Sequence, residues 1–148
     1  MKTKTEVKVL ALEQFLKETG DFTAKDEEQD IIATCEKYIE DGDYLVYTDE
    51  EADEAAADYI KESVWAFKKS FLNFHSEAIA EIDDKSFAKL QEGGESINKA
   101  LWAMIDDKEH FIKHAINADG RGYFLSPYDG EENEVKINGE YYFIYRQN

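Results

Sequence analysis

The sequence has one cysteine, one proline and only two arginines among 148 residues. The single Cys35 excludes an intramolecular disulfide and is typical of a reducing compartment. No apolar run approaches the roughly 18 residues that a membrane-spanning helix needs, and the N-terminal segment lacks the apolar stretch of a signal peptide. From these absences we expect a cytoplasmic protein with no membrane partner.

Basic residues are also scarce. The chain has 17 Lys and Arg against 34 Asp and Glu, which gives a formal net charge of −17. Affinity for nucleic acids and for anionic lipid surfaces depends on Lys and Arg that neutralise phosphates. We therefore expect no direct binding of nucleic acid. A basic protein partner, metal cations or plain solubility remain as explanations of the charge.

The composition otherwise indicates a folded chain. Hydrophobic residues make up 43% of the sequence and aromatic residues 14%, and the length fits one domain with a real core. We expect a single domain over residues 1–148. An acidic helical part would occupy about residues 1–118, and a β-unit about residues 119–148.

Apolar residues at three- and four-residue steps predict the helices. Helices are expected over residues 12–19, 26–40, 48 to about 69, parts of 76–91, and 96–118 with an interruption at Asp106-Asp107. Thr48 followed by Glu51 is a capping-box pattern that starts the third of these. Residues 5–11 could form a short strand, and residues 44–47 an edge strand.

The hydrophobic period changes to two near the end of the chain. We expect a strand over residues 122–126, a turn over 127–130 and a hairpin around Asn138-Gly139, whose two-residue turn pairs Val135 with Tyr142. Both faces of the hairpin are apolar, so helices are expected to cover at least one of them. The predicted fold class is α+β, with four to six helices packed on a small C-terminal antiparallel β-sheet.

Residues 119–134 concentrate the residues that fix loop geometry. Three of the eight glycines, the only proline and Arg121 lie there. We expect Arg121 to pair with a nearby carboxylate and to hold the turn at 129–132 against the end of the preceding helix. An exposed recognition or catalytic role for Arg121 is the alternative. The residues of this predicted structural loop are Asp119, Gly120, Arg121, Gly122, Tyr128, Asp129 and Gly130.

The negative charge is unevenly distributed. Residues 21–54 contain fourteen acidic residues and two lysines, for a net charge of −12. Carboxylates four residues apart on a helix lie about 6 Å apart along its axis, a spacing of the same order as that of phosphates on one nucleic-acid strand. The predicted partner-binding residues are Asp26, Glu27, Glu28, Asp30, Asp49, Glu50, Asp53, Glu54 and Asp58. The alternative is a solvated helix surface that only keeps the protein soluble.

The sequence offers little for catalysis. Cys35 lies on an apolar helix stripe, and no nucleophile elbow, phosphate loop or dinucleotide fingerprint is present. His110 and His114 lie one helical turn apart, as two metal ligands can, with Asp106 or Asp107 one turn back, but the His-Glu-x-x-His pattern is absent. The acidic residues 129–134 lack the ligand pattern of an EF-hand loop. We expect no catalytic residue, cofactor or metal, with a small metal-dependent enzyme as an alternative.

The motif Asp-Gly-Arg-Gly-x-x-Leu-Ser-x-Tyr-Asp-Gly-Glu-Glu-x-Glu at residues 119–134, followed by residues 142–146, resembles the C-terminal end of a family of small acidic phage- and prophage-encoded proteins. Residues 48–54, 59–60 and 65–67 are similar to the middle of the same family. The resemblance covers roughly residues 44–146 and assigns no catalytic residue. It implies a phage protein in the cytoplasm of a bacterial host.

Together, the charge and the resemblance predict a non-enzymatic interaction protein. Its acidic surface would bind a basic host protein, as a nucleic-acid mimic that inhibits a defence nuclease or DNA-binding protein of the anti-restriction or anti-CRISPR type. The alternative is an accessory protein-binding domain that uses the Arg121 loop and the aromatic sheet.

Overall fold

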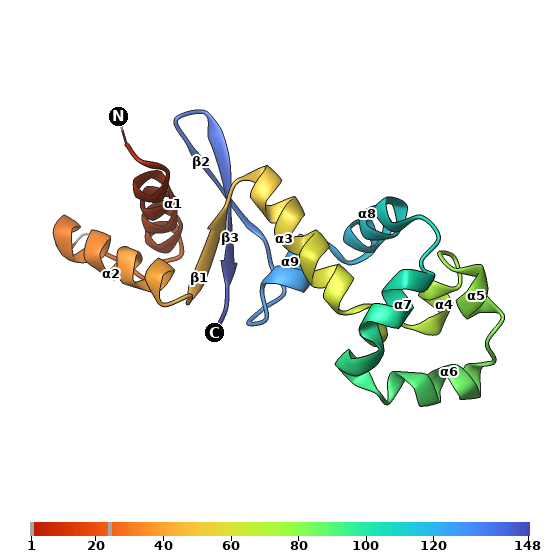
Figure 1. Ribbon diagram of the computed structural model, residues 1–148. Coiled ribbons are helices and arrows are strands. Elements are labelled where there is room, and N and C mark those ends of the chain that lie inside the picture. Colours follow the sequence, from red (N-terminus) through yellow and green to blue (C-terminus); the bar gives the residue numbers. More distant parts are fainter. Residues whose placement is uncertain (1, 24) are drawn as a thin grey trace. The chain divides into compact units, whose positions relative to one another are not determined.

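The computed structural model describes residues 2–23 and 25–148 (Figure 1). The α+β class is confirmed: nine α-helices and one three-stranded antiparallel sheet occur in these residues. The contacts divide the chain into two compact units, Met1–Ala55 with Arg121–Asn148, and Ala56–Gly120. Among the described residues, no helix is both long and apolar enough to cross a membrane.

The sheet of the first unit has the strand order β1-β3-β2. β2 (Asn133–Ile137) and β3 (Glu140–Arg146) form the predicted hairpin, and Val135 is paired with Tyr142. Asn138 and Gly139 have φ values of 51° and 85°, the positive values that such a two-residue turn requires. β1 (Tyr44–Tyr47) pairs with β3 and confirms the predicted edge strand.

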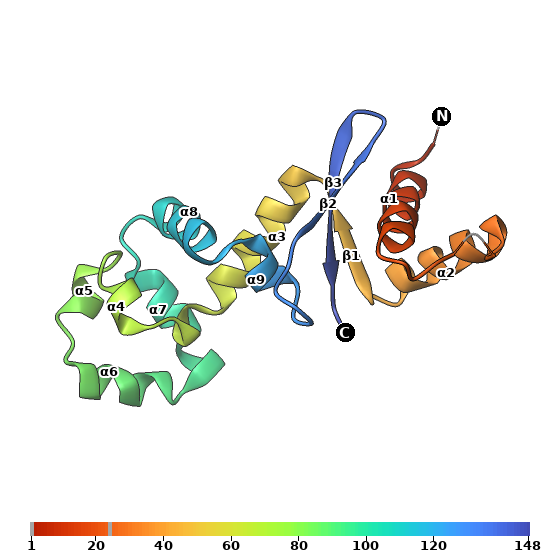
Figure 2. The ribbon, with the colours of Figure 1, turned by 180° about the vertical axis from the view of Figure 1, so that it is seen from behind.

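One face of this sheet is covered by α1 (Lys4–Glu18) and α2 (Glu28–Glu40) (Figures 1 and 2). Val135, Tyr142 and Ile144 point from the strands into a core that these helices complete. The helices contribute Val9, Ala11, Leu12, Leu16, Ile31 and Cys35 to it. Cover of this face by helices was expected from its apolar residues.

The predicted strand over residues 5–11 is wrong, because these residues lie within α1. Thr3 and Glu6 form a capping box in which each side chain accepts a hydrogen bond from the other's backbone N–H. The helix then buries Val9, Leu12 and Leu16 on one side. The short alternation around Val7 and Val9 was too brief to outweigh this longer helical period.

The other face carries Phe143 and Tyr145, and α3 (Asp49–Glu62) begins on this side of the sheet (Figures 1 and 2). The predicted strand over residues 122–126 is also wrong, because α9 (Arg121–Leu125) occupies most of it. The N–H of Ser126 donates to the carbonyl of Gly122, which is a helical bond. The short apolar run Tyr123-Phe124-Leu125 resembled a buried strand, while local backbone bonding favoured a helical turn.

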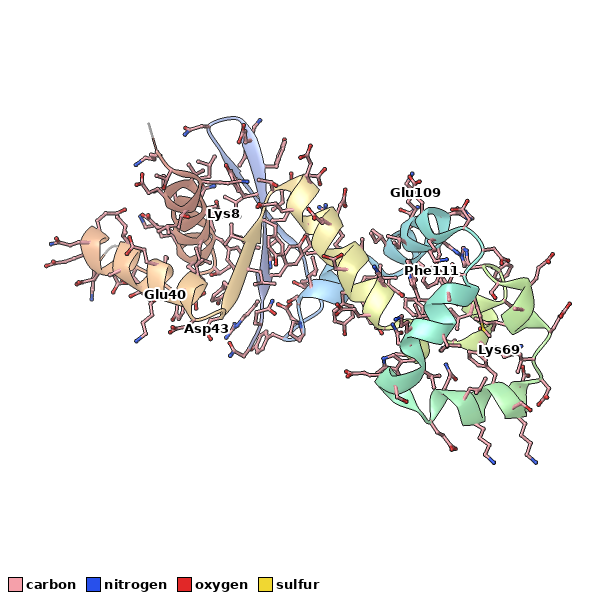
Figure 3. The ribbon with its side chains drawn as sticks, in the orientation of Figure 1. Lys8, Glu40, Asp43, Lys69, Glu109 and Phe111 are labelled. Carbon is pink, nitrogen blue, oxygen red and sulfur yellow. The ribbon has the colours of Figure 1, made fainter. Side chains whose placement is uncertain are left out.

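The second unit is helical. It contains α4 (Lys69–Leu72), α5 (Glu77–Ala80), α6 (Asp84–Gln91), α7 (Asn98–Met104), α8 (Lys108–Asp119) and the 3-10 turns Val64–Ala66 and Gly94–Ile97. The predicted interruption at residues 106–107 is confirmed, and Asp107 caps α8. Phe111 points from α8 into the core (Figure 3) with Ile60, Leu72, Ile79, Phe87, Leu101 and Ile105.

α3 ends earlier than predicted, at Glu62 instead of about residue 69. The hydroxyl of Ser63 donates to the carbonyl of Tyr59, and Trp65 donates its N–H to the side chain of Asn98. Side-chain groups therefore replace the helical bonding at this point. Val64, two residues beyond the end of the helix, is fully buried.

Candidate functional site

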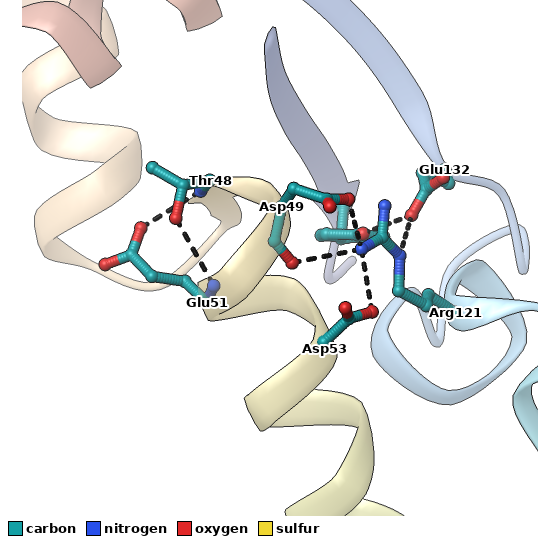
Figure 4. A network of polar contacts seen from close by, with 7 residues as sticks. Thr48, Asp49, Glu51, Asp53, Arg121 and Glu132 are labelled. Atoms are coloured by element: carbon teal, nitrogen blue, oxygen red, sulfur yellow. Dashed lines mark hydrogen bonds and ion pairs between the residues drawn. The ribbon is translucent and has the colours of Figure 1, made fainter. Parts of the chain in front are cut away.

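The first turn of α3 is tightly fixed. The side chain of Thr48 accepts a hydrogen bond from the N–H of Glu51 at 3.3 Å, and Glu51 accepts one from the N–H of Thr48 at 3.0 Å (Figure 4). Lys8 of α1 lies 2.9 Å from the same carboxylate. Burial acts to raise the pKa of Glu51, but the bonds from Thr48 and Lys8 outweigh it and lower the pKa to about 2. The predicted capping box is confirmed.

Arg121 lies beside this turn and pairs with three carboxylates (Figure 4). Its Nε donates to Glu132 at 2.7 Å, and its Nη1 donates to Asp49 at 2.8 Å and to Asp53 at 3.0 Å. The same Nη1 lies 3.1 Å from the backbone carbonyl of Asp49. Asp49 and Asp53, which lie 72 and 68 residues before Arg121 in the sequence, are thus joined to the loop.

The Arg121 side chain is only 11% exposed, and its guanidinium lies 4.5 Å above the ring of Phe143. Tyr145 donates its hydroxyl proton to Glu132, so this carboxylate is held from two sides. Burial acts to lower the pKa of Arg121, but the bonds to Glu132 and Asp49 raise it above its ordinary value. The guanidinium is therefore a permanently charged, largely buried cation. It joins α9 to the first turns of α3 and to Glu132, the residue directly before β2.

The prediction that Arg121 pairs with a carboxylate is confirmed, but two of its three partners differ from those expected. We expected acids close in sequence, at 119 and 129–132, and of these Glu132 is the one that bonds to Arg121 among the described residues. Asp49 and Asp53, assigned to a partner surface, are its remaining partners. No sequence signal could have found them, because the contact depends on how α3 lies against the sheet.

The second glycine of the Asp-Gly-Arg-Gly motif, Gly122, lies against the backbone of the loop that follows α9. A Cβ added to it would lie 2.6 Å from the backbone carbonyl oxygen of Gly130 and 2.7 Å from the backbone nitrogen of Glu132. Only glycine allows α9 to approach the loop over 130–132 so closely. The loop is therefore fixed by backbone contact as well as by Arg121.

The remaining predicted loop residues are anchored to the end of β3. The hydroxyl of Ser126 lies 2.7 Å from Oδ1 of Asp129 and 2.8 Å from the carbonyl of Arg146. The guanidinium of Arg146 stacks over the ring of Tyr128 at 3.9 Å. Gly130 has a φ of 72°, which favours glycine. Asp119 is the last residue of α8, and Gly120 caps that helix with a φ of 83°.

The predicted acidic residues form two groups that the structure does not bring together. Asp26, Glu27, Glu28 and Asp30 lie at the start of α2, which covers one face of the sheet, whereas α3 begins on the other face (Figures 1 and 2). All of these acids are exposed. A single continuous surface over residues 26–54 is therefore not formed.

Part of the α2 group is engaged inside the protein. Glu28 bonds to Lys17 at 3.1 Å, and Lys17 also bonds to Glu13 at 2.7 Å. Glu13 is 5% exposed, and its Oε2 has no hydrogen-bond partner among the described residues. Burial and then the neighbouring Glu28 raise the pKa of Glu13. Glu28 thus serves the contact between α1 and α2.

The α3 group contains four carboxylates that remain unengaged. Glu50, Glu54, Asp58 and Glu62 follow one another at steps of four residues along this single helix, and all four are exposed. No ion pair to any of them occurs within residues 2–23 and 25–148. We call these four residues the α3 ladder; Glu62 was not among the predicted partner-binding residues.

A histidine cluster in the second unit brings together His75, His110 and His114. Nε2 of His75 lies 2.6 Å from Nδ1 of His114, and the rings of His75 and His110 are 5.2 Å apart. Burial, followed by the charges of His114 and His110, lowers the pKa of His75. His75 was not among the predicted metal-ligating residues, because it lies far from α8 in the chain. No group of three or more metal-ligating side chains placed to hold an ion occurs in the described part of the chain.

Cys35 is fully buried, and burial raises the pKa of its thiol to about 12. A thiol in this state is a packing group and not a nucleophile.

Comparison of the chain with models of protein families, with curated proteins and with solved structures finds no match. The sequence features and the geometry of the two units are therefore the basis of the functional proposal.

Proposed function

We propose that this is a non-enzymatic interaction protein that binds a basic protein surface through the α3 ladder. The observation that carries the proposal is the ladder itself: four exposed like charges on one helix, with no ion pair to any of them in the described part of the chain. Like charges four residues apart destabilise a helix by roughly 0.2–0.5 kcal/mol per pair. A surface that costs stability in this way is suited to a partner that supplies the missing positive charge.

The spacing of the ladder supports mimicry of a nucleic-acid backbone. Its carboxylates rise by about 6 Å per step along the helix, a distance of the same order as that between phosphates of one strand. A groove of Lys and Arg that binds a strand would find comparable anions here. The net charge of −17 would also accelerate the encounter with such a groove.

The resemblance to phage-encoded proteins suggests the class of partner. Host nucleases and other DNA-binding proteins, including restriction and CRISPR effectors, expose basic grooves that an acidic helix could occupy. On this proposal the protein inhibits such a partner in the cytoplasm of a bacterial host and itself catalyses nothing. The burial of its only thiol and the engagement of Arg121 with three carboxylates support a non-catalytic role.

The rigid capping of α3 fits this function. The Thr48–Glu51 box and Arg121 fix the first turn of the helix, and Arg121 neutralises Asp49 and Asp53 but not the ladder. The network therefore presents the outward carboxylates from an ordered element. Arg121 itself is too buried for a partner to bind, which disfavours the alternative of a recognition loop built on it.

A pull-down from bacterial lysate with stepwise salt elution tests the proposal. Three forms are compared. They are the unaltered protein, a ladder variant (E50Q, E54Q, D58Q, E62Q) and a matched α2 variant (E27Q, D30N, E36Q, E40Q). The α2 variant removes four exposed charges, one at the N-cap of α2 and three within the helix. The unaltered and α2 forms should retain a basic nucleic-acid-binding protein that elutes between about 0.1 and 1 M salt, where the Debye length falls from about 10 to 3 Å. The ladder variant should not retain it. Equal retention by the ladder variant refutes the proposal.

A further inference from the structure

The first unit contains a pocket of about 280 Å³ at the end of the sheet where β1 begins and β3 ends. Its walls come from the segment after α1, the end of α2 and the two strands. The residues that matter here are Asp21, Phe22, Tyr38, Asp43, Tyr44 and Arg146. Asp43 lies at the turn from α2 into β1 (Figure 3).

Aromatic rings and carboxylates share this pocket. The rings of Tyr38 and Tyr44 are 5.4 Å apart and tilted by 57°, so they do not close against each other as a flat stack. The carboxylate of Asp43 has no hydrogen bond or ion pair within the described residues. Asp21 accepts a bond from the hydroxyl of Thr19 on one oxygen, which leaves its other oxygen available.

Among the described residues that line the pocket, Arg146 is the one cation, and it already has partners. The guanidinium of Arg146 stacks on Tyr128 at 3.9 Å, and its Nε donates to the backbone oxygen of Asn148 at 2.9 Å. An anionic ligand would meet two carboxylates here and the net charge of −17 of the chain. The ring of Tyr44 already has the guanidinium of Arg146 over it, 6.0 Å from its centroid. A second cation would find the carboxylates of Asp21 and Asp43 and the rings of Phe22 and Tyr38. This combination binds ammonium and guanidinium groups.

We propose that this pocket binds the cationic side chain of an arginine or lysine from a basic protein partner. The source of the side chain rests on the proposed function, whereas the chemistry of the pocket does not. The volume exceeds that of one such side chain, so water can complete its hydrogen bonds.

The test uses the full chain and a blocked arginine, N-acetyl-arginine N-methylamide, in a titration followed by backbone amide NMR shifts. The matched ligand is blocked citrulline, in which a neutral urea replaces the guanidinium. We expect saturable shifts at Phe22 and Tyr44 with the arginine ligand and at least a threefold weaker response with citrulline. Equal binding of both, or shifts confined to the α3 ladder, overturns the proposal.

Variants separate the pocket from general charge attraction. Asp43→Asn should weaken binding of the arginine ligand roughly threefold, the scale of one partly exposed ion pair. The control Asp41→Asn removes the same charge two residues away, outside the pocket lining, and should leave the affinity unchanged. Equal weakening by the two variants contradicts a defined pocket.

The two proposals fail separately. The arginine titration requires no partner, so it tests the pocket even if the pull-down recovers nothing. If the ladder variant loses a partner that Asp43→Asn and Asp41→Asn retain equally, then the proposed function stands and the pocket is not its contact. If Asp43→Asn alone weakens retention, then the partner supplies the cation.

Discussion

Neutralising the middle of the α3 ladder should make the protein more stable. The double variant E54Q/D58Q removes three like-charge pairs at once, because Glu54 faces Glu50, Asp58 faces Glu54, and Glu62 faces Asp58, each across one helical turn. At roughly 0.2–0.5 kcal/mol per pair, the gain in free energy of unfolding is about 0.6–1.5 kcal/mol. For a chain of this length, 1 kcal/mol raises Tm by roughly 2–4 °C.

Thermal unfolding followed by circular dichroism at low salt measures this gain. The gain should vanish near 1 M salt, where the Debye length is about 3 Å. The control variant E131Q/E134Q removes two exposed charges outside any helix and reports the effect of a lower net charge alone. A Tm that falls in E54Q/D58Q, or that rises equally in the control, would refute the cost assigned to the ladder.

Three further predictions concern the internal contacts. Gly122→Ala should lower the free energy of unfolding by about 3 kcal/mol, because the added Cβ would clash with the backbone of residues 130–132. Gly130→Ala should lower it by only about 1 kcal/mol, because its Cβ would lie in open space and only the positive φ is unfavourable. Urea unfolding measures both changes. Arg121→Met should lower the free energy of unfolding by about 2–4 kcal/mol in the same assay. This loss is smaller than that expected for breaking a fully buried ion pair, because two of the three carboxylates, Asp49 and Asp53, are largely exposed. The lowered pKa of His75 means that the unfolded chain binds its proton first, so Tm should fall as pH drops below about 6.5, and His75→Gln should flatten that fall.

Each of these has a clear contrary result. Equal costs for the two glycine variants would deny the close approach of the α9 backbone to the loop over 130–132. An Arg121→Met protein as stable as the original would show that the three ion pairs contribute no net stability. A pH profile unchanged by His75→Gln would place the acid sensitivity on other groups.

The parts of the fold that local sequence determines were predictable. The Asn138-Gly139 turn requires positive φ at both positions, and it fixed the pairing of Val135 with Tyr142. The Thr48–Glu51 box likewise marked the start of α3. These signals act within a few residues, so no knowledge of distant contacts was needed.

The errors arose where short apolar patterns were ambiguous or where tertiary contacts decided the outcome. Residues 5–11 show a few alternating residues and residues 122–126 a short apolar run, and in both cases helical backbone bonding prevails. The end of α3 depends on Asn98, whose side chain accepts a hydrogen bond from the backbone N–H of Trp65. Asn98 lies 33 residues after Trp65 in the sequence. Such a contact leaves no mark in the sequence around residue 65.

The candidate site shows the same division. That Arg121 would pair with a carboxylate followed from its chemistry. Asp49 and Asp53 were unforeseeable as its partners, because they lie 72 and 68 residues away in the sequence and only the tertiary fold brings them together. The ladder could be counted from the sequence once α3 was placed. The separation of the α2 and α3 acids could not, since it depends on which face of the sheet each helix covers.

The most direct test of the central claim is a displacement measurement with the basic partner recovered in the pull-down. A fluorescently labelled DNA duplex bound to that partner is titrated with this protein, and the anisotropy of the label is followed. If α3 imitates a nucleic-acid strand, the unaltered protein and the α2 variant displace the DNA and the ladder variant does not. Binding of the unaltered protein to the partner without release of DNA would contradict mimicry by α3.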